Sequence, residues 1–458
     1  MPNIIQNAGE AAAVVSGHIE AGKGIPRQVF YDRAKGCFWY CNSAGQWIAM
    51  TKDALTSRLK RDGYRRKLND GEALSPLEIR QLEIMEDYQV SYAGPLAGHW
   101  TGLVENNGNR ILVTSSPKLV TPAKGEWPLL DAVLRGMFVH EDCDQRPYFH
   151  GWMKIAEQSL RSRQAQPGQV LVLAGPRECG KSMLQTNVIT EILGGRSAKP
   201  YQFMTGGTPF NSDLFAGEHL MMEDDQPFTN LAARRDFGSR IKDMTVNRDQ
   251  RLHAKGRDAL ILRPFWRVTF SLNDEPENLM ALPPLDESIM DKISLFLCRK
   301  VPMPMPSTTP DERAAFGAAI RAELPAYVHW LREEFVIPED LRAHRFGITH
   351  WHHPRIVEEI SGLAPEVQLL GHIDALLFDS PAPGAWWGTA EELQRQLTGS
   401  DFRFARQAEK LLSWSNACGV YLGRLAHKFP ERVKREDTAH RSRRGWRISP
   451  PSEGETPY

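Results

Sequence analysis

The chain has 458 residues, which is too long for one compact core and favours two to four domains. Hydrophobic residues make up 41% and charged residues 24% of it, as in ordinary globular proteins, and no apolar run approaches the ~18 residues of a membrane span. Lys plus Arg and Asp plus Glu number 56 each, so any contact with nucleic acid must be local. The N-terminal "AAAVVSG" has no basic segment before it, so we expect a cytoplasmic protein without a secretory signal or membrane partner.

The cysteines and histidines show no metal-ligand spacing along the sequence. The six cysteines are dispersed, as free thiols are, and the close pair Cys37 and Cys41 has no second pair to complete a zinc site. The three histidines of "THWHHP" (residues 349–354) have no acidic or cysteine partner nearby. The stretch "EDCD" (residues 141–144) is more typical of a loop. We therefore expect no metal site in these segments.

Residues 1–120 are predicted to form a small α+β domain for assembly or partner binding. In residues 28–50, aromatic and polar positions alternate around "NSAG", which predicts a β-hairpin. Leu55 and Leu59 have helical spacing within the basic stretch "TKDALTSRLKRDGYRRKL". Its basic surface is either a solvated face or a DNA contact.

Residues 121–305 are predicted to form an α/β nucleotide-binding core, preceded by helices from Pro128 to about Arg163. "PGQVLVLAG" is a continuous apolar run that enters a glycine loop, as a buried parallel strand does, and "KSMLQTNVITEIL" then has helical character. "EHLMMEDD" and "FWRVTFSLND" read as two more buried strands.

The glycine loop consists of Gly175, four residues, and then Gly180, Lys181 and Ser182. Between a strand and a helix, such a loop turns backbone N–H groups onto phosphate oxygens, and the helix N-terminus favours negative charge. Lys181 would reach the β- and γ-phosphates of ATP, and the Ser182 hydroxyl would bind Mg²⁺. The predicted nucleotide-binding residues are Gly175, Pro176, Arg177, Glu178, Cys179, Gly180, Lys181, Ser182 and Met183.

Two further strand ends offer the groups that ATP hydrolysis requires. Glu223 and Asp224 follow an apolar strand about 40 residues after the loop, where one carboxylate would hold Mg²⁺, here Glu223, and another would orient the attacking water. Asn273 ends "RVTFSLN", and its amide can bond both the γ-phosphate and the water. Taken alone, each feature also fits an ordinary loop start or turn.

The loop, the acidic strand end and Asn273 lie within about a hundred residues. The stretch "IKDMTVNRDQRLHAKGRDALILRPFWRVTFSLNDEP" resembles the segment between the second and third motifs of superfamily 3 helicases. More closely, the chain resembles the helicase part of phage and mobile-element primase-helicase proteins. The resemblance implies a P-loop AAA+ core in which the glycine loop is Walker A, Glu223 and Asp224 are Walker B, and Asn273 is the sensor. It also implies a hexameric ring that moves along single-stranded DNA with 3′ to 5′ polarity.

The resemblance also places His253, Lys255 and Arg257 in a hairpin that points into the ring channel. Two cations two residues apart could grip successive phosphates by charge without reading bases. Apart from the family, an exposed charged turn is the simpler interpretation.

Lys292 occupies the position of the family's arginine finger, about twenty residues after Asn273. A lysine supplies the charge but lacks the planar fork of arginine. If the finger lies elsewhere, Arg299, Arg234 and Arg235 are the next candidates.

After the proline-rich segment "KVPMPMPSTTP", residues 306–380 are predicted to form a helical connector, residues 381–450 resemble a winged helix, and residues 451–458 form a loose tail. A capping box of Thr389 and Glu392 starts the first of three helices in the winged-helix segment. Residues 401–447 hold twelve Lys or Arg against five Asp or Glu, which favours DNA as its ligand. The predicted DNA-binding residues of this segment are Tyr421, Arg424 and Lys428 on one face of the third helix, and Arg441, Arg443 and Arg444.

These features predict an ATP-dependent replicative DNA helicase of a phage or mobile element, with ATP and Mg²⁺ as cofactors. We expect it to bind single-stranded and duplex DNA and to form a homo-oligomer, a hexamer by the resemblance. The alternative is a non-translocating AAA+ switch that binds DNA and recruits or loads replication partners. Residues 1–120 are too few for a polymerase-type domain, so a primase or polymerase would be a separate partner.

Overall fold

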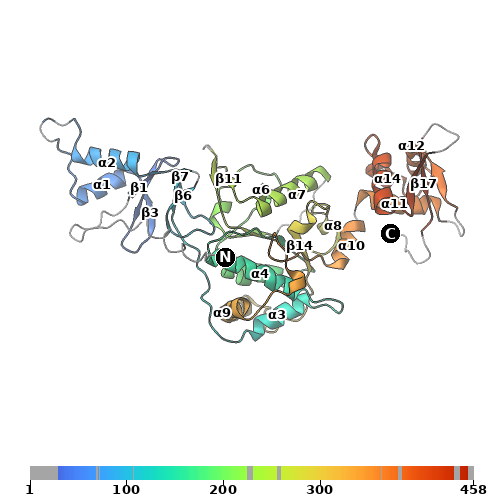
Figure 1. Cartoon of the computed structure of the whole chain (residues 1–458), viewed down its shortest axis with the longest axis horizontal. Coiled ribbons are helices and arrows are strands. Elements are labelled where there is room, and N and C mark those ends of the chain that lie inside the picture. The colour runs from blue at the N-terminus through green and yellow to red at the C-terminus, as the bar shows by residue number, and fades with distance from the viewer. Residues whose placement is uncertain are drawn as a thin grey trace, which may run out of the picture. The chain divides into compact units, whose positions relative to one another are not determined.

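The computed structural model describes residues 29–68, 71, 73–106, 108–223, 231–254, 259–362, 364–379, 384–437 and 444–451 (Figure 1). The chain divides into two compact units. The first runs to Gly94 and adds Trp100–Ser115, and the second comprises Pro95–His99 and the chain from Ser116 onward. None of the helices in the described ranges is long and apolar enough to cross a bilayer.

The first unit contains two small sheets and two helices. One sheet has the strand order β3-β2-β1-β4 and the other β5-β7-β6. β1 and β2 pair antiparallel, as do β2 and β3 around "NSAG", so the predicted hairpin is confirmed. Leu55 and Leu59 of α1 are buried against Leu77 and Ile84 of α2, as their spacing predicts. The elements are β1 (Val29–Asp32), β2 (Cys37–Cys41), β3 (Trp47–Met50), α1 (Lys52–Arg61), α2 (Pro76–Asp87), β4 (Gln89–Val90), β5 (Tyr92–Gly94), β6 (Gly102–Asn106) and β7 (Asn109–Val113).

The second unit is built on a five-stranded sheet with the order β14-β8-β13-β10-β9, in which every pairing is parallel. The strands β8, β10, β13 and β14 are buried along their whole length, as continuous apolar runs predict. The predicted α/β core with a parallel sheet is thereby confirmed. The strands are β8 (Val170–Ala174), β9 (Ser197–Ala198), β10 (His219–Met222), β13 (Arg267–Leu272) and β14 (Ile293–Leu297).

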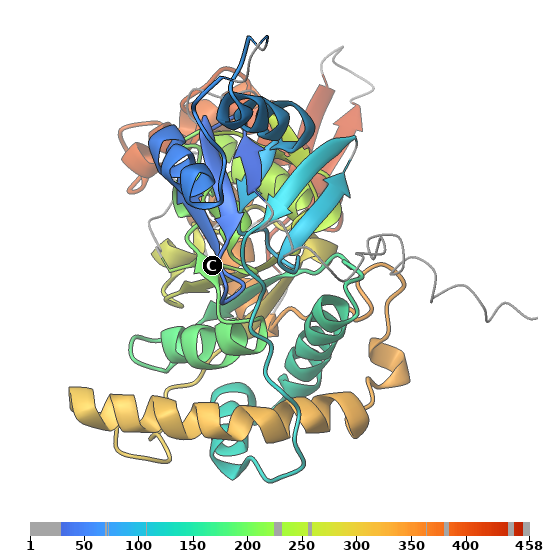
Figure 2. The same ribbon diagram turned by 90° about the vertical axis from the view of Figure 1, so that its left-hand side faces the viewer.

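Helices pack around this sheet, and the long helix α9 (Pro310–Glu333) contacts α3 (Pro128–Phe138) and α4 (Arg146–Arg161) (Figure 2). α3 has no capping side chain of its own at its N-terminus. Instead, the Glu323 carboxylate of α9 accepts hydrogen bonds from the backbone N–H groups of Leu129 and Leu130, at 3.1 and 2.8 Å. A carboxylate at a helix N-terminus satisfies free N–H groups and favours the helix dipole, so it ties α9 to α3. The other elements of the core are α5 (Lys181–Met183), the π-helix η1 (Leu184–Thr190), α6 (Tyr201–Met204), η2 (Leu214–Ala216), α7 (Leu231–Val246), β11 (Gln250–Leu252), β12 (Leu260–Leu262), α8 (Pro276–Leu279), η3 (Met290–Lys292) and η4 (Glu339–Leu341).

The C-terminal part has a hydrophobic core of its own. Three helices, α12, α13 and α14, pack with an antiparallel sheet of order β15-β17-β16. Leu369, Leu370 and Ile373 of α11 belong to the same core, so this module begins before the expected start at residue 381. The elements are α10 (Pro354–Gly362), α11 (Pro365–Leu377), β15 (Trp386–Gly388), α12 (Ala390–Leu397), α13 (Ala405–Leu411), α14 (Ala417–Lys428), β16 (Val433–Asp437) and β17 (Arg444–Ile448).

A buried polar network joins the π-helix to the sheet. The Thr190 hydroxyl donates to the Gln185 carbonyl oxygen at 2.9 Å, so it must accept from Nδ1–H of His219, which lies 2.6 Å away. Because burial keeps His219 neutral, its Nε2 carries no proton and accepts from the Thr269 hydroxyl, at 2.7 Å. Thr269 in turn accepts from the Gln185 amide at 2.7 Å. Burial lowers the pKa of His219 to about 3.

This network predicts a loss of stability in mild acid. Below pH 6.5 the unfolded chain binds a proton at His219 that the folded chain does not, so the free energy of unfolding falls as the pH falls. Between pH 7 and pH 5 the loss should be about 2 kcal/mol for this residue. Urea unfolding at both pH values should show that His219→Gln loses about 2 kcal/mol less than the wild type. The exposed His344→Gln is the control, and equal losses in the wild type and His219→Gln would contradict the assignment.

Candidate nucleotide-binding site

The glycine loop sits between the carboxyl ends of β13 and β14. Gly175 donates its N–H to the Leu272 carbonyl oxygen at 3.2 Å, and Cys298 donates its N–H to Ala174 at 2.6 Å. A Cβ at Gly175 would lie 2.4 Å from the Cys298 carbonyl oxygen, so only glycine allows this approach. Gly180 has φ +95°, a left-handed conformation that glycine adopts without strain.

Lys181 lies over the loop that precedes it. Its ammonium donates to the carbonyl oxygens of Gly175 and Pro176, at 2.5 and 2.9 Å. These bonds hold the positive charge at the mouth of the loop, beside the N-terminus of the helical segment formed by α5 and η1. The arrangement provides a cation and a helix dipole at one place, as an anion site requires.

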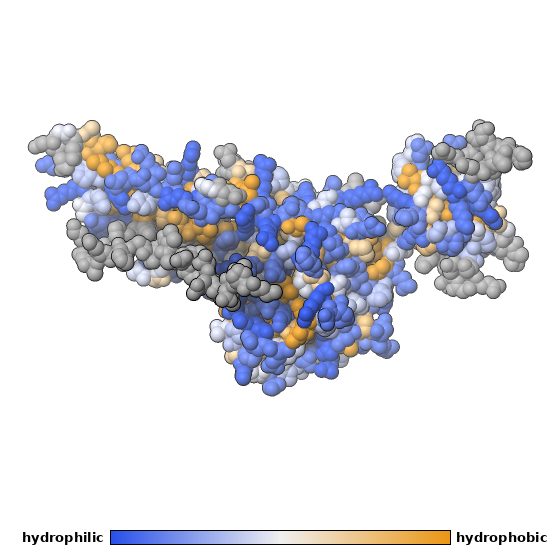
Figure 3. Space-filling view, viewed as in Figure 1, coloured by the Kyte–Doolittle hydropathy of each residue, from blue (hydrophilic) through white to orange (hydrophobic). Residues whose placement is uncertain are grey.

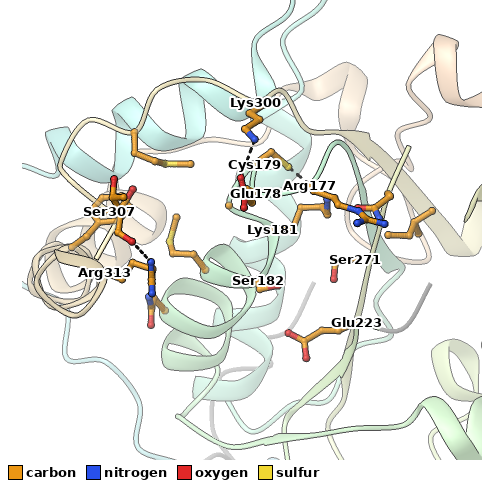
Figure 4. Close-up of a pocket in the computed structure, with 18 residues that line it drawn as sticks. Arg177, Glu178, Cys179, Lys181, Ser182, Glu223, Ser271, Lys300, Ser307 and Arg313 are labelled. Atoms are coloured by element: carbon orange, nitrogen blue, oxygen red, sulfur yellow. Dashed lines mark hydrogen bonds and ion pairs between the residues drawn. The ribbon is translucent and has the colours of Figure 1, made fainter. Parts of the chain in front are cut away.

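A cavity of about 920 Å³ opens beside this loop (Figure 4). It is lined by loop residues from Arg177 to Met183, by Glu223 and by Asn273. Figure 4 shows Lys181, Ser182, Ser271 and Glu223 around the same opening. The structure thus brings together the loop, the acidic strand end and the amide that the sequence singles out. Their roles in binding or hydrolysis stay predictions.

The acidic strand end is described only in part. Glu223 follows β10, and its carboxylate pairs with the ammonium of Lys199. Glu223 and the Ser182 hydroxyl line the same cavity, and both are oxygen donors of the kind that Mg²⁺ prefers. Asp224 lies outside the described residues.

Two buried cysteines connect the loop to the sheet. The Cys298 thiol, at the end of β14, donates a hydrogen bond to Cys179 in the loop and, with the nearby Lys181 ammonium, lowers the pKa of Cys179 to about 6. Burial raises the pKa of Cys298 well above its usual value. The two cysteines lie 119 positions apart in the sequence, so their spacing gives no sign of this contact.

The proline-rich segment and α9 also line the cavity, which sequence reasoning missed. Lys300, Thr308 and Arg313 belong to this wall. The Lys300 ammonium pairs with the Glu178 carboxylate at 3.1 Å, and the Arg313 guanidinium donates to the Thr308 carbonyl oxygen. The prolines of "KVPMPMPSTTP" exclude a regular helix and indicate a linker. The lysine and the hydroxyl residues of the same segment are the sequence feature that could have indicated a role at the cavity.

Lys292, the predicted finger, is buried and paired within its own subunit. Its side chain is only 9% exposed, and its ammonium pairs with Asp291, which also contacts Arg345. These contacts hold the ammonium within its own subunit, and the role of Lys292 as a finger stays a prediction. Of the alternatives, Arg234 is buried and bonded to the Leu282 carbonyl oxygen.

The predicted channel hairpin is described up to its tip. β11 and β12 pair antiparallel, with Gln250 opposite Leu262. His253 follows β11 and is held by the Asn211 side chain, whose oxygen accepts the His253 N–H at 2.7 Å. Lys255 and Arg257 lie outside the described residues.

The predicted DNA-binding face of α14 is only partly exposed. Tyr421 is 6% exposed and packs into the C-terminal core, so it cannot read DNA as predicted. Arg424 pairs with Glu366 of α11 at 3.3 Å, whereas Lys428 is exposed. Arg441 and Arg443, as well as the Arg444 side chain, lie outside the described part of the chain.

The comparison with solved structures identifies a common fold. The A form apo structure of the NrS-1 C-terminal region aligns with 93% of this chain and 96% of that chain, with a TM-score of 0.52 and 11% identity. A second apo structure of that region (305–718) has a TM-score of 0.51 at 11% identity, with the same coverage. The chain is similar in fold to the NrS-1 C-terminal region.

A structure titled "SCCmec type IV Cch - active helicase" also matches, over 88% of this chain and 73% of that chain at 11% identity. Its TM-score of 0.29 is too low to indicate a shared overall fold. No family model and no curated protein sequence matches the chain.

The burial of Lys292 generates a prediction. Lys292→Met keeps the length of the side chain and should hydrolyse ATP within about twofold of the wild-type rate, because the ammonium faces Asp291. Lys300→Met removes a cation from the cavity wall and should lower kcat/KM for ATP about tenfold. Steady-state ATPase assays measure both. A large loss of ATPase activity in Lys292→Met with an unchanged melting temperature would instead support Lys292 as the finger that acts on a neighbouring subunit.

Proposed function

We propose that this chain is an ATP-dependent DNA helicase that works as a ring of identical subunits during replication of a phage or mobile element. The observation that supports this most is the single cavity where the Lys181 loop, Glu223 and Asn273 meet at the carboxyl ends of three neighbouring parallel strands. A cation, carboxylate and amide set at this edge suits phosphoryl transfer to water.

Each side chain of the cavity has a role in this proposal. Lys181 neutralises charge on the β- and γ-phosphates, and the loop N–H groups bind phosphate oxygens. Ser182 and Glu223 would hold Mg²⁺, which would supply positive charge to offset that of the phosphates. Asn273 would bond the γ-phosphate and the attacking water, and Asp224, which lies outside the described residues, is predicted to orient that water.

Lys300 and Arg313 add two cations to the phosphate end of the site. Both come from the chain that follows β14, so they belong to the same subunit as Lys181. Because Arg313 lies on α9 and Lys181 on the helical segment after the loop, phosphate bound between them would link two parts of the core. The finger from a neighbouring subunit would then be one of the exposed arginines Arg235 and Arg299.

DNA contacts are proposed at two places. The hairpin of β11 and β12 would carry Lys255 and Arg257 to single-stranded DNA in the ring channel. The C-terminal module, with three helices and an antiparallel sheet, would act as a winged helix that binds duplex DNA. On the face shown in Figure 3, hydrophilic residues cover most of the surface.

The proposal predicts that hydrolysis and unwinding depend on the cavity. Lys181→Ala should weaken nucleotide binding, and Glu223→Gln should lower kcat by about 100-fold or more while nucleotide still binds. Both should fail to separate a forked duplex in a strand-displacement assay. Lys124→Ala changes an exposed lysine outside the cavity and outside the basic helix α1, so it is the control and should behave as wild type. Nucleotide-dependent DNA binding by a wild type that separates no strands would favour the loading switch instead.

A second prediction concerns the C-terminal module. Lys428→Glu should weaken duplex binding and reduce the slope of log K against log salt by about 1, because one phosphate contact is lost. Lys410→Glu makes the same charge change on α13 and serves as the matched control. Fluorescence anisotropy across a salt series measures both. Equal effects of the two changes would mean that only the overall charge of the module matters.

A further inference from the structure

Two segments far apart in the sequence meet at the edge strand β14. The loop between α3 and α4 closes through an antiparallel bridge of Val139 with Asp144. The segment before α10 lies along β14, where His352 bridges Leu295 and His353 donates its N–H to the Leu295 carbonyl oxygen at 3.0 Å.

Gln145 holds both segments in place. Its amide donates to the Leu297 carbonyl oxygen at 2.8 Å, and its oxygen accepts from the Leu297 N–H at 3.0 Å and from the Trp351 indole at 2.9 Å. Gln145 is fully buried, so these bonds fix the distance between the loop and the segment. The meeting of the two segments is therefore a property of the fold.

Three metal-ligating side chains converge at this junction. Ligand atoms of Asp142, Cys143 and His353 all lie within 4.8 Å of one another. In a tetrahedral zinc site, bonds of 2.0 to 2.3 Å place neighbouring ligand atoms roughly 3.3 to 3.8 Å apart. Small side-chain shifts would thus bring all three onto one ion, and the exposed Asp142 leaves a route for it to enter.

His353 supplies an independent observation. Its side chain is buried, with 3% of the residue exposed, yet neither ring nitrogen has a hydrogen-bond partner. A buried polar group without a partner costs about 1 to 3 kcal/mol, and native proteins seldom leave one unexplained. A metal ion on one ring nitrogen would explain it.

We propose that Asp142, Cys143 and His353 form a zinc site, with water in the fourth position. A thiolate, an imidazole and a carboxylate together favour Zn²⁺ over Mg²⁺ and Ca²⁺, which prefer oxygen ligands alone. The ion would link the α3–α4 loop to the segment before α10, and so clamp both along β14. The site shares no residue with the nucleotide cavity and does not depend on the proposed helicase activity.

Metal binding to the full chain without an affinity tag tests the proposal. The protein is stripped with a chelator, kept free of nucleotide and titrated with Zn²⁺ or Co²⁺. The wild type should bind one tight equivalent, and Co²⁺ should give a thiolate charge-transfer band in the near ultraviolet. Cys143→Ser and His353→Gln should each weaken binding by about 100-fold or more, since even the loss of an outer-shell partner costs 10- to 100-fold.

Matched variants separate this site from others. Cys41→Ser and His350→Gln change the same residue types elsewhere and should bind as wild type, and Glu223→Gln should also keep the tight equivalent. Zn²⁺ should raise the melting temperature of the wild type but not of Cys143→Ser. If His353→Gln fails to fold, Cys143→Ser decides, because that residue lies half-buried in a loop. A wild type that retains no metal after dialysis, or a Cys143→Ser protein with the wild-type affinity and cobalt spectrum, would overturn the proposal.

Discussion

The pairing of β13 with both β8 and β10 is the constraint on which the candidate site depends. In sequence, β13 follows β10, but in the sheet it lies between β10 and β8. Because all three strands are parallel, their carboxyl ends meet at one edge. Asn273 is thereby placed between the Lys181 loop and Glu223, and the cavity contains a cation, an amide and a carboxylate within one subunit.

The edge strand β14, next to β8, supports the Lys181 loop by packing. Gly175 approaches the Cys298 backbone so closely that no Cβ fits, and Cys298 ends β14. β14 is an edge strand, and its outer side is covered by the Gln145 bonds and by the segment that contains His353. A zinc ion at Asp142, Cys143 and His353 would reinforce this cover. Because Cys298 contacts Gly175, a movement of β14 would therefore displace the Lys181 loop.

The basic side chains of this chain differ in how the fold holds their charge. Acidic and basic residues are equal in number, and some cations of the described residues are paired within the fold, as Lys199 is with Glu223 and Arg424 with Glu366. Lys181 is held instead by carbonyl oxygens, which do not cancel its charge. The cavity thus keeps a cation available for an anionic ligand in a protein without net charge.

The sequence by itself determined the local features: the loop from Gly175 to Ser182, the buried strands that end at Glu223 and Asn273, and the amphipathic helix of Leu55 and Leu59. These depend on the period of apolar residues and on glycine conformation, which act over a few residues. Only the tertiary structure decided which distant side chains meet. Lys292 is buried beside Asp291, and Tyr421 packs into the C-terminal hydrophobic core, because tertiary packing rather than local spacing decides which side chains are exposed. Lys300 and Arg313 lie about 120 to 130 positions after the loop, and the chain that follows β14 brings them to the cavity. His353 meets Asp142 and Cys143 across about 210 positions, because both segments cover β14.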